Sequence, residues 1–193
     1  MTIEEISKLD AACRQLDTAI ELWFRESDPV SIHTLACSAH QIIHDTIRHR
    51  GGQAFLHSPY IRREFRKRAE GYFRRSYSFL KHADRDPETS IEFDTSAPEG
   101  FILASVVELG QLGIGPNVLR FGFAIYFGFH SPDLFTKKFF QDFHLDRFPK
   151  VNLPRPIFLE KLRQVSPILE RHLETFDVLS RNRRARQNAK NSN

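Results

Sequence analysis

Hydrophobic residues recur at helical spacing along the first fifty residues of the chain. Between residues 2 and 25 the apolar positions lie three, four or seven apart, which is the pattern of an amphipathic helix. Thr2 and Glu5 form a capping box, so we expect this helix to begin at residue 2. Asp28-Pro29 predicts a second helix with Asp28 as its N-cap, and Gly51-Gly52 predicts its end. Two helices joined by so short a turn predict an antiparallel hairpin.

The rest of the chain also follows helical rather than strand periodicity. We expect a third helix from Ser58-Pro59 to about His82, and then a polar, acidic loop. Three further helical segments are expected over residues 97–113, 116–129 and 157–180, the last with a kink or break at a proline. The predicted fold class is all-α, a helical bundle with an N-terminal antiparallel helical hairpin and a C-terminal helical extension.

This pattern predicts one helical domain over residues 1–180. Residues 131–180 form the extension, and residues 181–193 are expected to be a disordered basic tail.

Composition narrows the class of protein. Hydrophobic residues make up 40% and charged residues 27% of the 193 residues, which is typical of a soluble globular domain. Two cysteines exclude a disulfide scaffold. The longest apolar stretch, residues 121–129, is far shorter than the ~20 residues of a membrane helix. We therefore expect a cytoplasmic protein that does not bind a membrane, and no cofactor motif is present.

The net charge of +4 is unevenly distributed. Residues 181–193 carry five basic and no acidic residues, so the remaining 180 residues are slightly acidic. Within them, residues 60–82 carry eight basic residues against two glutamates. The expected third helix is therefore strongly basic, which favours a polyanionic partner such as RNA.

Three residues of that helix lie on one stripe. Arg68, Arg75 and His82 are spaced seven apart, so each lies about 20° from the next around the helix. Histidine titrates near neutral pH and suits general acid–base catalysis, while arginine stabilises charge on a phosphate. In RNA the 2′-hydroxyl can act as the nucleophile, so this pair suits phosphodiester cleavage without a metal.

The helical hairpin followed by an R-x6-H pattern resembles the HEPN superfamily. The matching residues are Arg75 and His82, and the architectural resemblance covers roughly residues 2–130. It implies a small helical bundle that acts as a metal-independent endoribonuclease of a bacterial toxin or defence system, in which the motifs of two subunits meet at a dimer interface. In this interpretation Arg68, Arg74 and Lys81 hold the RNA backbone.

A non-catalytic alternative stays open. Nine of the 18 phenylalanines lie between residues 121 and 148, too many for one helix face. This segment would form a homo-oligomer or partner interface if the protein were an interaction module.

A second cluster of polar residues lies on the second helix. His33, His40 and His44 fall within about 40° of one another, and His40 and His44 have a spacing that metals use. The stripe borders the core, where histidines are usually structural, so we assign no metal and keep His40 and His44 as the candidate ligands. A site would need ligands from another helix, for which the neighbouring first helix offers Glu5, Asp17 and Glu21.

Overall fold

The computed structural model describes residues 2–64, 79–80, 87–142, 145 and 150–191. Within these ranges the chain forms helices and one isolated β-bridge, which confirms the predicted all-α class. In chain order the elements are α1 (Lys8–Phe24), α2 (Pro29–His49), the 3-10 turn η1 (Phe55–His57), α4 (Ala97–Gln111), α5 (Val118–His130), the 3-10 turn η2 (Pro132–Leu134), α6 (Lys137–Asp142) and α7 (Arg155–Asn191).

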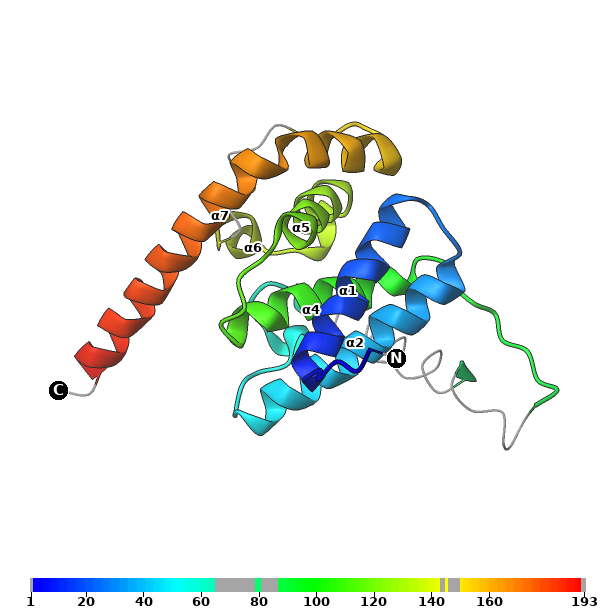
Figure 1. Ribbon diagram of the computed structural model, residues 1–193, viewed down its shortest axis with the longest axis horizontal. Helices are drawn as coiled ribbons and strands as arrows, with labels where there is room; N and C mark the ends of the chain where they lie inside the picture. The colour runs from blue at the N-terminus through cyan, green and yellow to red at the C-terminus, as the bar shows by residue number, and fades with distance from the viewer. Residues whose placement is uncertain (1, 65–78, 81–86, 143–144, 146–149, 192–193) are drawn as a thin grey trace.

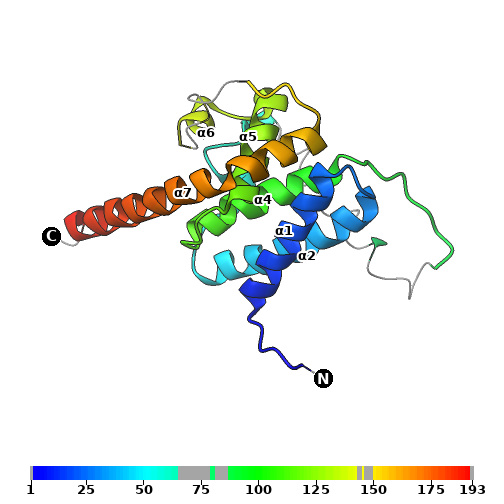
Figure 2. The same cartoon turned by 45° about the horizontal axis from the view of Figure 1, so that its top comes forward.

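Helices α1 and α2 form the predicted antiparallel hairpin (Figures 1 and 2). The Asp28 carboxylate accepts a hydrogen bond from the backbone N–H of Ser31 at 2.8 Å, as an N-cap does. The predicted start of the first helix is wrong, because Ser7 rather than Thr2 caps it. Ile3 is 89% exposed. Residues 2–6 therefore have no core to pack against, and a helix there would gain little from burial.

Helix α4 runs through the centre of the bundle and packs along α2. A helix that is apolar on all sides must be buried on all sides. Eleven of the 15 residues of α4 are buried, and one of them is the acidic residue Glu108. The most central helix of the fold therefore carries a charged side chain into the core.

Several phenylalanines of the described part of the aromatic segment pack into the core of their own chain. Phe123, Phe127, Phe135 and Phe139 are all buried, and the rings of Phe135 and Phe139 stack with centroids 4.0 Å apart. These four side chains are therefore used inside the chain and are not free to form an interface. Whether the protein forms an oligomer stays a prediction.

Helix α7 docks through its first turns and then extends away from the bundle (Figures 1 and 2). Leu159 and Leu162 are buried, and Arg155 lies 4.7 Å above the ring of Trp23. The helix continues through Pro167 to Asn191. Residues 181–191 are thus helical, whereas the sequence predicted a disordered tail from residue 181. Beyond Pro167 the helix contains no glycine or proline, so no residue interrupts it.

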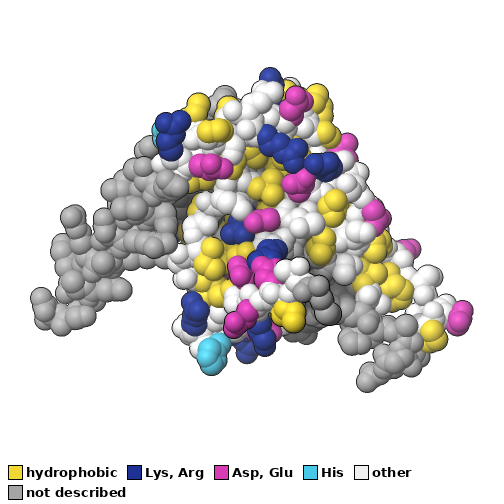
Figure 3. Space-filling view, viewed as in Figure 1, with side chains coloured by type: hydrophobic (Ala, Val, Ile, Leu, Met, Phe, Trp, Pro, Cys, Tyr) yellow, Lys and Arg dark blue, Asp and Glu magenta, His cyan; other side chains and the backbone are white. Residues whose placement is uncertain are grey.

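Charges of both signs alternate over the face formed by α1 and α7 (Figure 3). Glu21 pairs with Arg163 at 2.9 Å and with Arg25 at 2.8 Å, and Glu26 pairs with Arg155. This face is consequently not a single-sign surface.

The segment after η1 differs from the prediction at its start. Residues 58–62 form a turn and the bridge between Ile61 and Phe135 instead of the first turn of a helix. The bridge holds this segment against the chain that follows η2 through a hydrogen bond from the Thr136 N–H to the Tyr60 carbonyl at 2.9 Å. Across the ranges that the structure describes, no helix combines the length and apolarity needed to cross a bilayer.

Close packing of α7 on α5 depends on Gly122. A Cβ atom at this position would lie 2.3 Å from Cδ2 of Leu162. We expect Gly122→Ala to lower the free energy of unfolding by about 1–2 kcal/mol, because a buried leucine must move. Chemical denaturation measures this change. Gly110→Ala in α4 is the matched control, since an added Cβ there meets nothing within 4 Å, and we expect it to be neutral or stabilising by up to about 1 kcal/mol. Equal effects of the two substitutions would contradict this packing.

Candidate metal centre

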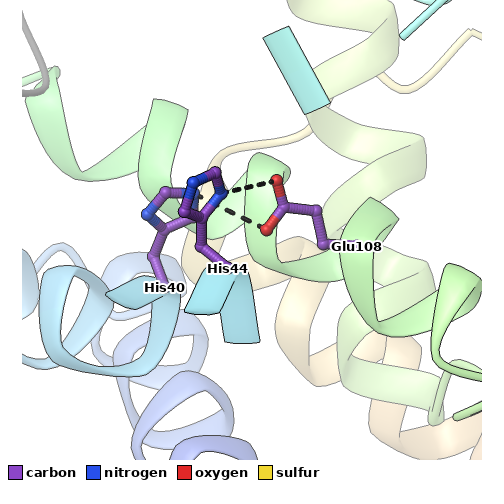
Figure 4. A group of neighbouring side chains, drawn as sticks. All are labelled: His40, His44 and Glu108. Atoms are coloured by element: carbon purple, nitrogen blue, oxygen red, sulfur yellow. Dashed lines mark hydrogen bonds and ion pairs between the residues drawn. The ribbon is translucent and has the colours of Figure 1, made fainter. Parts of the chain in front are cut away.

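Two histidines of α2 face one carboxylate of α4 (Figure 4). His40 and His44 are one helical turn apart, so their rings lie on the same side of α2 and stack with centroids 5.4 Å apart. Nε2 of His40 lies 3.8 Å from Oε2 of Glu108, and Nδ1 of His44 lies 3.5 Å from Oε1. The packing of α2 on α4 therefore brings together three groups that can bind a metal.

Glu108 is the most constrained member of this cluster. Its side chain is 1% exposed. Oε1 accepts a hydrogen bond from the backbone N–H of Phe55 at 2.8 Å, which ties the start of η1 to α4. Oε2 is buried and has no hydrogen-bond partner. A buried carboxylate oxygen without a donor is costly, so this atom calls for a positive ligand.

His40 and His44 differ in how readily each can carry a positive charge beside Glu108. Burial lowers the pKa of His40 to about 4, so this imidazole is neutral at neutral pH and can offer a lone pair. The hydrogen bond with Glu108 raises the pKa of His44. Of the two imidazoles, His44 can therefore carry a positive charge more readily, and its Nδ1 lies 3.5 Å from Oε1 of Glu108.

The spacing of the three groups is close to that of a metal site. One ligand atom from each residue lies within 4.8 Å of the others. Two ligands bound to a tetrahedral zinc ion at about 2.0–2.1 Å are about 3.3 Å apart. Metal binding would therefore require the two partly exposed imidazoles to move closer to Glu108 and to each other. The side chains of His40 and His44 are 17% and 25% exposed, so the cluster lies at the edge of the core.

The third ligand is not among those that the sequence offered. Asp17 forms a two-hydrogen-bond ion pair with Arg120, Glu21 pairs with Arg163, and Glu5 lies on the exposed segment before α1. The sequence did not identify Glu108 as a candidate ligand, because His44 and His40 lie 64 and 68 residues before it in the chain. One signal was available: Glu108 is the only charged residue of the apolar run 101–109.

His33 does not join the other two histidines. It is fully buried, its Nε2 lies 3.2 Å from Sγ of Cys37, and its ring contacts the edges of Phe93 and Phe101. His40 also contacts Phe101. The same stripe of α2 therefore contains one histidine packed among aromatic rings and two that face a carboxylate.

The residues predicted to act on RNA cannot be compared with this site. Arg68, Arg74, Arg75, Lys81 and His82 lie outside the residues that the structure describes. Their role stays a prediction.

Comparisons of the chain with protein-family models, with characterised proteins and with solved structures found no match. The resemblance to the HEPN superfamily therefore also stays a prediction.

The burial of His33 predicts a pH-dependent stability. Burial lowers its pKa from 6.5 to about 4, so between these pH values the unfolded chain binds more protons than the folded one. The free energy of unfolding should therefore fall as the pH drops from 7 to 5, and His33→Leu should remove about 1–2 kcal/mol of that fall. Denaturation at both pH values gives the difference. The exposed-histidine variant His49→Gln is the control, and an unchanged fall in His33→Leu would refute the assignment.

Proposed function

We propose that this protein binds a divalent transition-metal ion through His40, His44 and Glu108. The observation that carries the proposal is the buried, unpartnered Oε2 of Glu108 beside two imidazoles. A cation at this point would give the oxygen a ligand and would replace the long contact to His44. Two histidines and a carboxylate are a ligand set that zinc and iron(II) both use in proteins.

The arrangement has the features of a site that retains an open position. Structural zinc sites are usually closed by four protein ligands, whereas catalytic sites use three and leave a position for water or substrate. Three ligands converge among the described residues, and both imidazoles reach solvent. The N–H of Phe55 holds one carboxylate oxygen in place, as the outer partners of metal ligands do. The proposed function is therefore metal binding with a coordination position available for chemistry.

Metal binding can be measured on the purified full chain after chelation. We expect Zn²⁺ to bind with a stoichiometry of about one by isothermal titration calorimetry, and Co²⁺ to give visible d–d absorption. His44→Gln and Glu108→Gln should each weaken binding at least tenfold, which is about 1.4 kcal/mol. Glu108→Gln keeps the acceptor for the Phe55 N–H, so it tests the charge of the carboxylate with little change in shape.

His49→Gln is the matched control for this experiment. His49 lies at the end of the same helix and is exposed, but it is not part of the cluster. The affinity of the His49→Gln variant for Zn²⁺ should equal that of the wild type. Equal affinities of wild type, His44→Gln and Glu108→Gln would refute the site, as would a wild type that binds neither ion.

We also propose RNA cleavage as a second candidate function, which rests on the sequence alone. The observation that favours it is the excess of basic residues between positions 60 and 82, with Arg75 and His82 on one stripe. His82 would act as acid and base, and Arg75 would stabilise charge on the phosphate. This reaction would need no metal.

An RNA-cleavage assay with EDTA separates the two candidate functions. If the second proposal holds, the wild type cleaves RNA with the chelator present, and His82→Ala and Arg75→Ala lose activity by about 100-fold or more. Arg181→Ala in the basic C-terminal segment is the control for a general loss of positive charge. Equal cleavage by all variants, or none by the wild type, would refute catalysis by this pair.

A further inference from the structure

Arg48 is a positively charged residue near the proposed metal centre and is not one of its three ligands. Arg48 lies one turn beyond His44, so His40, His44 and Arg48 follow one another along the same edge of α2. Arg48 is exposed, so its guanidinium is accessible from solvent beside His44. Among the described residues no carboxylate pairs with Arg48.

An arginine at this point opposes the binding of a metal but suits the binding of an anion to that metal. Coulomb repulsion between the guanidinium and a divalent ion weakens metal affinity, so Arg48 gives the metal site no advantage. The guanidinium presents a planar pair of donors that matches two oxygens of a carboxylate or phosphate. Arg48 weakens metal binding and forms no ion pair among the described residues. An oxyanion that lies between Arg48 and the metal would give this arginine a role.

The charges of the neighbouring groups are compatible with that ligand. Asp45 follows His44 in the chain, is exposed, and its Oδ2 accepts a hydrogen bond from Nε2 of Gln41 at 2.9 Å. With a divalent ion bound, the charges of Glu108 and Asp45 are matched by the ion, and Arg48 leaves the site net positive. The metal-loaded site therefore favours an anion, whereas the metal-free site does not.

We infer that the metal-loaded site binds an oxyanion of the phosphate or carboxylate class, with one oxygen on the open coordination position and the others held by Arg48. The inference rests on the proposed metal site and names the class of its ligand. Arg48 acts in this scheme as a specificity-determining residue, because it selects anions that offer at least two oxygens.

The inference can be tested with Co²⁺-loaded full-length protein. Inorganic phosphate and acetate are titrated in separate arms, and chloride serves as an anion that cannot accept two hydrogen bonds from a guanidinium through separate oxygens. We expect phosphate or acetate to change the d–d spectrum with saturation, and the arm with the lower dissociation constant identifies the ligand class. Arg48→Gln and Arg48→Lys should each weaken that oxyanion at least fivefold, since lysine keeps the charge but lacks the planar donor pair.

Two controls keep the outcome unambiguous. Arg50→Gln removes an exposed cation just beyond the same helix end and should leave oxyanion affinity unchanged. Co²⁺ affinity of Arg48→Gln should equal or exceed that of the wild type, which shows that the metal site is intact. A wild type that binds Co²⁺ but shows no spectral response to phosphate or acetate, or an equal response in Arg48→Gln, overturns the oxyanion inference alone. A wild type that does not bind Co²⁺ overturns both proposals.

Discussion

The need to compensate one buried carboxylate organises the centre of this protein. Glu108 lies in α4, the helix that the bundle surrounds, and its side chain is almost completely removed from solvent. Moving an ionised carboxylate out of water costs several kcal/mol unless hydrogen bonds or opposite charge replace the lost hydration. One oxygen receives the Phe55 N–H, and the other faces His40 without a hydrogen bond. The elements around α4 are therefore arranged about a charge that is only partly satisfied.

This constraint links the fold to the site. The hairpin of α1 and α2 presents one face of α2 to α4, and the same packing that buries Ile43 and Ile47 places His40 and His44 beside Glu108. The hydrogen bond from Phe55 then fixes the chain that leaves α2 and leads into the basic segment. Buried ion pairs seldom stabilise a fold more than well-packed hydrophobic residues do. If Glu108 served stability alone, an apolar side chain at this position would stabilise the protein at least as well. The metal ion proposed above would supply the opposite charge that the Glu108 carboxylate lacks.

Local sequence signals predicted the elements better than they predicted the site. Asp28-Pro29 and Gly51-Gly52 marked the ends of α2 because caps and glycines act within a few residues. The capping box at Thr2 failed for a tertiary reason, since residues 2–6 are exposed and bury no apolar side chain. His40 and His44 were recognised from their spacing on one helix. Glu108 could not be matched to them, because periodicity shows which side of a helix is buried but not which residue of another helix it meets. His33 shows the same limit, since it shares the stripe but lies among aromatic rings.

Diffraction from metal-loaded crystals would show directly whether a metal ion lies between α2 and α4. Data collected at the zinc absorption edge should show one anomalous peak within about 2.0–2.2 Å of His40 Nε2, His44 Nδ1 and a carboxylate oxygen of Glu108. A bound water or anion should complete the coordination on the solvent side. Zn²⁺ bound only at other residues, with the Glu108 carboxylate and the two imidazoles free of metal, would show that these three residues do not form a metal site.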